Sequence, residues 1–95
     1  MFDITRDDSG TIHLEGRLDA AHVVAAKEVF SLVDASCIVD FARLGYISSA
    51  GLGVLFATQK RLVDRGEALT LTNLNPHIRE VFRIAGFDTI FDIDE

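Results

Sequence analysis

Cysteine, long apolar runs and a leader-like N-terminus are scarce or missing in this chain of 95 residues. The single cysteine, Cys37, excludes an intramolecular disulfide and argues against a metal cluster built on thiolates. Its place in the apolar segment CIVDF predicts a buried thiol in a strand. No stretch approaches the ~20 apolar residues that span a bilayer, and the first residues, MFDITRDD, have neither a basic nor an apolar region typical of a secretory signal. We therefore expect a cytoplasmic protein without membrane insertion.

Basic residues are also few. The chain carries 9 basic and 15 acidic residues, a formal net charge of −6, which disfavours nucleic acid as a partner. An acidic surface is compatible with a basic protein partner, although it also serves simply to keep a small domain in solution. With 48% hydrophobic residues and no repeat, linker or low-complexity stretch, residues 1–95 are expected to form one globular domain whose function lies on one surface.

The first half of the chain predicts a hairpin, a helix and a buried strand. Phe2 to Arg6 and Thr11 to Glu15 alternate between apolar and polar residues, and DDSG between them supplies a turn. Asp19 stands in the position of a helix N-cap. The apolar stripe that follows at helical spacing consists of Val23, Ala26, Phe30 and Val33. Cys37 to Phe41 is a short apolar run, typical of a central strand covered on both faces.

The second half of the chain predicts a long helix followed by another strand. The helix is expected from about Ser49 to Arg65, and Gly66 can end it. Its apolar stripe is formed by Leu52, Leu55, Phe56, Gln59, Leu62 and Val63. Ala68 to Thr72 has the pattern of the next strand.

A third helix is expected after Asn75, which supplies an N-cap, and Pro76, which suits the first turn. Gly86 is expected to end this helix. Its buried face consists of Ile78, Val81, Phe82 and Ala85. Thr89 to Ile93 is expected as a short edge strand. The order β-β-α-β-α-β-α-(β) then predicts an α/β fold with a mixed sheet of four to five strands and about three helices.

One rim of this sheet is predicted to gather polar side chains. The crossover from Cys37 to Thr72 implies a parallel strand pair, and functional groups often lie beyond the carboxyl ends of such strands. The second strand is expected to end near Asp19 and the third near Asp40. The pair Ser48 and Ser49 follows at the start of the second helix. These four side chains are therefore predicted to share the rim.

The serine pair lies where unpaired backbone NH groups and the positive end of the helix dipole are expected. If Ser48 caps the helix, its hydroxyl accepts from an NH two or three residues on, and Ser49 projects outward from the first turn. A phosphate on Ser49 would gain from the helix terminus and add about −1.5 to −2 charges to an acidic surface. Such a group would leave the helix intact and repel an acidic or apolar partner.

Three small residues, Ala50, Gly51 and Gly53, follow the serines. Each glycine inside a helix costs roughly 1 kcal/mol relative to alanine, so two within three positions need a reason beyond helix formation. The first turn and a half is expected to present bare backbone on the side away from Leu52 and Leu55. Either another part of the fold or a second protein approaches there, and the spacing alone does not decide between them.

The run VDFARLGYISSAGLGVLFATQKRL, residues 39–62, resembles the signature of the STAS domain family, the fold of bacterial anti-sigma factor antagonists. The matching features are Asp40, the pair Tyr46 and Ile47, the pair Ser48 and Ser49, and Gly51 with Leu52. GRLD before the first helix (residues 16–19) and FRIAGF at the end of the third (residues 82–87) are also similar to the family. The resemblance therefore extends over nearly the whole chain.

The resemblance implies a partner switch without catalysis or a cofactor. In antagonists of this family, the serine two residues before the Gly-Leu pair accepts a phosphate from an anti-sigma factor that is also a serine kinase with a GHKL-type ATP site. That position is Ser49 here. The unphosphorylated domain would bind the kinase and free a sigma factor, and a metal-dependent serine phosphatase would reset the cycle. The expected partner surface comprises Asp19, Asp40, Ser48, Ser49, Ala50, Gly51 and Gly53.

Two features depart from the family pattern. Many antagonists carry Asp immediately before the phosphoacceptor, where this chain has Ser48, so Ser48 is the alternative site of modification. The chain also ends at Glu95 without the last helix of many members, for which a homodimer or a shortened chain is an explanation.

Other functions compete with the switch. Some STAS proteins are scaffold subunits, in a phospholipid transporter or in stress-sensing complexes, and need no phosphate; weak nucleotide binding is a third interpretation. A catalytic serine in a G-x-S-x-G elbow would need glycine where Ile47 stands. Asp19 is alternatively only a helix cap, and Asp40 only an acceptor for loop amides. No metal site is expected at the histidines, which fall on different predicted elements: His13, His22 and His77.

Overall fold

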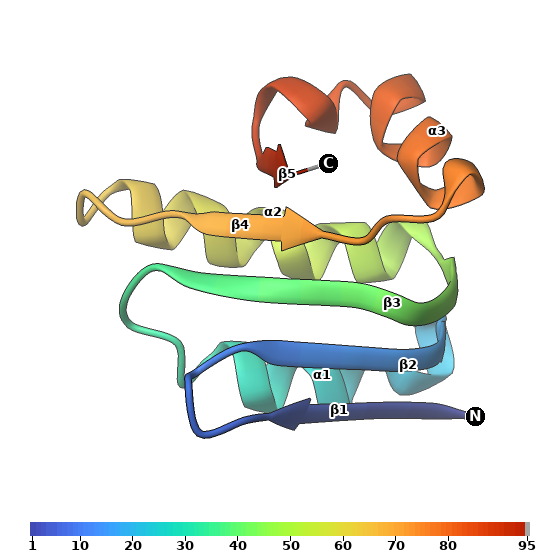
Figure 1. Ribbon diagram of the computed structural model, residues 1–95, viewed down its shortest axis with the longest axis horizontal. Helices are drawn as coiled ribbons and strands as arrows, with labels where there is room; N and C mark the ends of the chain where they lie inside the picture. Colours follow the sequence, from blue (N-terminus) through green and yellow to red (C-terminus); the bar gives the residue numbers. More distant parts are fainter. Residues whose placement is uncertain (95) are drawn as a thin grey trace.

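Strands and helices alternate to build one mixed sheet in the computed structural model, which describes residues 1–94 (Figure 1). The elements are β1 (Phe2–Arg6), β2 (Ile12–Leu18), α1 (Val23–Phe30), β3 (Cys37–Ile47), α2 (Ser49–Val63), β4 (Leu69–Thr72), α3 (Pro76–Ile84) and β5 (Asp92–Asp94), with short 3₁₀ helices at Ala20–His22 and Phe87–Thr89. None of the helices in this described part is both long and apolar enough to cross a membrane.

The strands lie in the order β1-β2-β3-β4-β5, as Figure 1 shows. β1 runs antiparallel to β2, and each of the other neighbouring pairs is parallel. The parallel pairs need helical crossovers, which α1, α2 and α3 provide. The predicted α/β order and mixed sheet are therefore confirmed.

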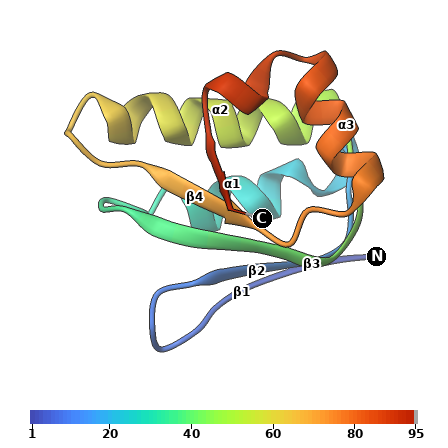
Figure 2. The ribbon, with the colours of Figure 1, turned by 45° about the horizontal axis from the view of Figure 1, so that its top comes forward.

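The core lies between the sheet and the helices. Ile12 and Leu14 of β2 and Val39 and Phe41 of β3 are buried beneath α1 and α2. α3 adds Phe82 to the same core, where its ring meets Phe41 edge to face with 5.9 Å between centroids. No helix within residues 1–94 covers the other side of β1, β2 and β3 (Figure 2), which we call the bare face. Because strand residues alternate, the residues between the core positions point to this face.

The starts of α2 and α3 fall where their sequence signals predict, whereas α2 ends at Val63 instead of about Arg65. Ser48 and Asn75 cap the two helices with side-chain oxygens. Gly66 and Gly86 follow them with φ of 78° and 76°, a left-handed conformation that suits glycine and stops a helix. These boundaries place Ser49 at the first position of α2.

The predicted end of β3 is wrong. The strand starts at the half-buried Cys37, whose pKa is raised by burial, and continues past Phe41 to Ile47. It continues because its second half keeps pairing with β2 beyond a register shift, with Arg17 opposite Tyr46. The Arg17 guanidinium also lies over the Tyr46 ring, 4.2 Å from its centroid. The carboxyl end of β3 is therefore at Ile47.

Two further expectations need correction. The last strand is Asp92–Asp94 instead of Thr89–Ile93, because Phe87–Thr89 forms a 3₁₀ helix first. The apolar stripe of α2 is also narrower than predicted, since Phe56 and Val63 are 38% and 55% exposed. The ring of Phe56 stacks on that of Phe87 at the outer side of the helix, with 5.5 Å between centroids.

Candidate functional site

Ser48 and Ser49 occupy different environments at the start of α2. The Oγ of Ser48 accepts a hydrogen bond from the Gly51 NH at 3.2 Å, and its own NH donates to the Leu18 carbonyl at 2.9 Å. Ser49 is exposed, and its hydroxyl has no hydrogen-bond partner within residues 1–94. The Ser48 hydroxyl is thus engaged in the helix cap, whereas the Ser49 hydroxyl is accessible.

The two glycines of α2 have opposite surroundings. Gly51 is buried, and a Cβ there would lie 2.8 Å from Leu18 Cγ and 2.9 Å from Ile47 Cγ1. Gly53 is exposed, and a Cβ there would have no atom within 4 Å. The expectation of bare backbone is therefore wrong at Gly51, because the ends of β2 and β3 pack against it. The accessible small residues are Gly53 and the exposed Ala50.

Asp19 lies on the same rim as Ser48, since the NH of Ser48 bonds to the residue before Asp19. Its Oδ1 accepts from the Ala21 NH at 3.1 Å and lies 2.7 Å from His22 Nδ1. It therefore caps the short 3₁₀ helix that precedes α1. The hydrogen bond with His22 lowers the pKa of Asp19, which keeps the carboxylate charged at neutral pH.

Asp40 does not share this rim, contrary to the sequence-based expectation. It lies near the start of β3, because the strand continues to Ile47. Its side chain points to the bare face, since it alternates with the buried Val39 and Phe41. Its Oδ1 accepts from the Ala42 NH and from Asn73 Nδ2, both at 2.9 Å. Burial raises the pKa of Asp40, but hydrogen bonds from Asn73, Ala42 and His13 outweigh this and leave the pKa below its usual value. Asp40 thus serves as an acceptor that joins β3 to the loop after β4.

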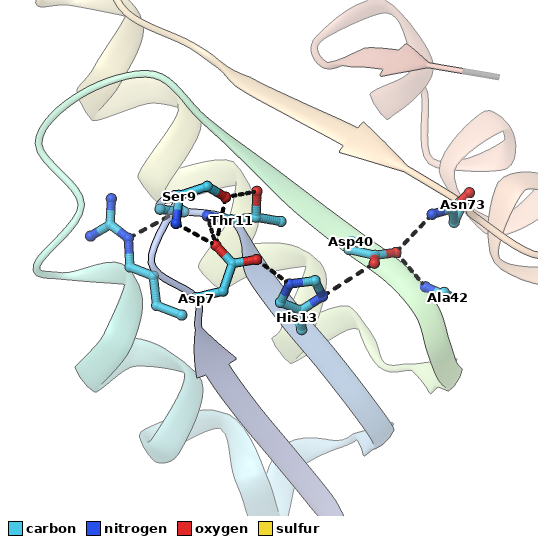
Figure 3. Close-up of polar contacts among 9 residues, drawn as sticks. Asp7, Ser9, Thr11, His13, Asp40, Ala42 and Asn73 are labelled. Carbon is cyan, nitrogen blue, oxygen red and sulfur yellow. Dashed lines mark hydrogen bonds and ion pairs between the residues drawn. The ribbon is translucent and has the colours of Figure 1, made fainter.

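A row of polar contacts crosses the bare face (Figure 3). His13 Nε2 lies 2.7 Å from Asp7 Oδ2, and His13 Nδ1 lies 3.2 Å from Asp40 Oδ2. The hydrogen bond with Asp7 raises the pKa of His13, while hydrogen bonds from Ser9 and His13 lower that of Asp7. Sequence analysis missed this cluster, because only the register of β2 against β3 brings His13 to Asp40. The alternation of β2, which turns His13 away from the core, was the one available signal.

The start of α2 is suited to carry an anion. The first turn of a helix has unpaired backbone NH groups and a positive dipole, and here an exposed hydroxyl stands beside them. A phosphate on this hydroxyl would be stabilised by both. Within residues 1–94, no group of three or more His, Cys, Asp or Glu side chains could hold a metal ion.

A family model described as "Mlab, STAS domain" matches residues 2–92. The protein BtrV of Bordetella bronchiseptica, named as a candidate anti-sigma factor antagonist, is 48% identical over 56 residues, which are 59% of this chain and 48% of BtrV. The aligned part thus spans about half the length of BtrV. A STAS-domain containing protein of Pseudomonas aeruginosa is 28% identical over 86 residues, which are 87% of this chain and 85% of that protein.

Solved structures of anti-sigma factor antagonists share the fold. One from Mycobacterium paratuberculosis superposes with a TM-score of 0.82 at 19% identity, covering 98% of this chain and 83% of that chain. SpoIIAA in its unphosphorylated form superposes with a TM-score of 0.73 at 20% identity, covering 100% of this chain and 88% of that chain. Phosphorylated SpoIIAA from Bacillus superposes with a TM-score of 0.71 at 22% identity, covering 100% of this chain and 92% of that chain. Together with the family match over residues 2–92, the shared fold identifies this chain as a member of the STAS domain family.

Proposed function

We propose that this chain is an anti-sigma factor antagonist that binds an anti-sigma factor serine kinase and is switched off by phosphorylation at Ser49. The observation that carries the proposal is the exposed hydroxyl of Ser49 at the start of α2, which has no hydrogen-bond partner within residues 1–94. The engagement of Ser48 in the cap favours Ser49 over Ser48 as the acceptor. Similarity to BtrV and to SpoIIAA, which has been solved in both unphosphorylated and phosphorylated forms, supports the same assignment.

The switch acts on the partner and leaves the fold intact. A phosphate at Ser49 adds about −1.5 to −2 charges where the helix dipole and free NH groups tolerate them. The added charge repels an acidic partner and must be desolvated by an apolar one. Binding of the kinase therefore weakens, while α2 keeps its cap at Ser48.

The docking surface centres on Ser49, Ala50 and Gly53, which are all exposed. Asp19 stands at the edge of this surface, on the rim that it shares with Ser48. Gly51 is buried beneath this surface, where the absence of a side chain lets α2 pack closely against the ends of β2 and β3. A metal-dependent serine phosphatase would restore the free hydroxyl, and the domain itself carries out no chemistry.

Intact-mass analysis after incubation with ATP and GHKL-type serine kinases of the source organism tests the proposal. Wild type and Ser48→Ala should each gain one phosphate, and Ser49→Ala should gain none. In binding measurements with the phosphorylating kinase, Ser49→Ala should keep wild-type affinity and Ser49→Asp should bind at least ~10-fold more weakly, about 1.4 kcal/mol. Modification of Ser49→Ala, or full affinity of Ser49→Asp, would contradict the assignment.

A second candidate is a STAS scaffold subunit without a phosphate switch, as in a phospholipid transporter or a stress-sensing complex. The family match over residues 2–92, described as "Mlab, STAS domain", fits this candidate as well as it fits the switch. A scaffold would bind its partner equally well as wild type, Ser49→Ala and Ser49→Asp. A transporter gene next to this one, in place of a kinase gene, would point the same way.

A further inference from the structure

A groove with a volume of about 580 Å³ lies between α1 and α2, the two helices seen side by side above the sheet in Figure 2. Its floor is apolar, and small residues of α2 leave it open. A Cβ at Gly53 would meet no atom within 4 Å, so a visiting side chain can approach the backbone there. The residues that line it include Val23, Lys27, Phe30, Ala50, Gly53 and Arg61.

The groove is held in shape by Arg61 of α2. Its Nη2 donates to the Phe30 carbonyl at 2.9 Å, and its Nη1 donates to the Val33 carbonyl at 2.7 Å. These carbonyls lie at and just beyond the end of α1, where a cation is favourable. The two helices are therefore tied together before any partner arrives, which reduces the free-energy cost of binding.

The charge of the groove is opposite to that of the whole chain. The protein has 15 acidic and 9 basic residues, yet Lys27 and Arg61 line the groove and none of the acidic residues within positions 1–94 does. Lys27 is exposed and forms no ion pair within residues 1–94. Arg61 bonds to neutral carbonyls and forms no ion pair with a carboxylate among the described residues. An occupant with apolar and acidic side chains would match both the floor and the rim.

We propose that this groove receives an amphipathic helix of the anti-sigma kinase, with apolar side chains on the groove floor and Asp or Glu side chains beside Lys27 and Arg61. This inference rests on the proposed function and names the partner's contact surface. From Ala50 to Arg61 the groove wall follows α2 for roughly 16 Å at 1.5 Å per residue, about three helical turns. Ala50 also adjoins Ser49, so a phosphate there stands at one end of the groove and repels the acidic helix.

Matched charge reversals test the groove. Lys27→Glu and Lys60→Glu each replace an exposed +1 by −1 and so change the net charge equally, from −6 to −8, but only Lys27 lines the groove. With the kinase that phosphorylates Ser49, Lys27→Glu should raise the Kd at least ~10-fold, whereas Lys60→Glu should change it less than about twofold. Gly53→Leu fills the groove from its open position and should also raise the Kd at least ~10-fold. Thermal melts of each variant check that the fold is kept.

The outcomes separate the groove from the switch. The groove proposal is overturned if the two lysine variants weaken kinase binding equally, or if Lys27→Glu and Gly53→Leu both keep wild-type affinity. If Ser49 is still phosphorylated in the same samples, the proposed function then stands. If wild type neither binds nor is phosphorylated by any GHKL-type kinase tested, the proposed function fails and the groove proposal fails with it.

Discussion

The helix-covered face of the sheet and its bare face differ in what holds their key residues in place. Under α2, Gly51 is enclosed by the buried side chains of Leu18 and Ile47. On the bare face, the contacts of His13 with two aspartates lie at the surface, where the His13 side chain is 42% exposed. Close packing transmits any change of volume, whereas water weakens exposed ionic contacts. Substitutions under α2 should therefore have larger effects than substitutions on the bare face.

The largest effect is expected for Gly51→Leu. Even its Cβ would lie 2.8 Å from Leu18 Cγ and 2.9 Å from Ile47 Cγ1, so the whole side chain has no room. Overpacking of this kind should lower the free energy of unfolding by about 3 kcal/mol or more. Urea denaturation measures the change. Gly53→Leu is the matched control and should keep or raise the midpoint; equal losses in both variants would show that burial does not distinguish the glycines.

A smaller loss is expected for Ser48→Ala, which removes the side-chain acceptor from the Gly51 NH. Loss of an N-cap typically costs about 1 kcal/mol. Ser49→Ala removes no hydrogen bond formed within the described residues and should stay within ~0.5 kcal/mol of wild type. Thermal or urea denaturation of the two variants compares the serines directly. A larger loss at Ser49 would exchange the roles assigned to them.

A gain in stability is expected for Gly53→Ala. The position is helical, exposed and unobstructed, so alanine should contribute up to ~1 kcal/mol through its helix propensity. The same urea titration measures the rise in midpoint. A lower midpoint would contradict the open surroundings of Gly53, because it would mean that other atoms of the protein contact the backbone there.

Much of the covered face could be predicted from the sequence, because its signals are local. The Ser48 cap, the Asn75 and Pro76 start of α3 and the glycines after α2 and α3 each depend on a few neighbouring residues. The buried state of Gly51 could not be predicted, since it depends on where the ends of β2 and β3 meet α2. Helical spacing places Gly51 and Gly53 on different sides, but it does not say which side the strands approach.

The bare face was predicted poorly for a related reason. Asp40 was expected at the carboxyl end of β3, because the segment ARLG after Phe41 has little strand pattern of its own. Pairing with β2 nevertheless extends the strand to Ile47. Only this register aligns His13 with Asp40, so the cluster depends on tertiary contacts that single-sequence patterns do not contain.

The smallest effect, and the most dependent on pH, is expected at His13. Its pKa is raised by Asp7 and then by Asp40, so its contribution is fully present below the unfolded value of about 6.5 and is lost as the pH rises through the folded pKa. The pKa of Asp7 is lowered, so its contribution is present above about 3.9 and lost as the pH falls. The contacts should therefore stabilise most at mildly acidic pH. His13 and Asp40 line a hollow on the bare face, and the charged residues Asp3, Glu15 and Arg43 line it as well.

An NMR titration of the histidine rings tests this expectation. The midpoint for His13 in wild type should lie above 6.5, and Asp40→Asn should shift it downward by removing one of the two carboxylates. Between pH 6 and 9, His13→Gln should show a weaker decline in stability than wild type, since no imidazolium is left to lose its proton. A His13 midpoint at or below 6.5 would mean that water screens both aspartates completely. The bare face would then contribute its backbone pairing to the fold, and the polar row across it would contribute nothing measurable.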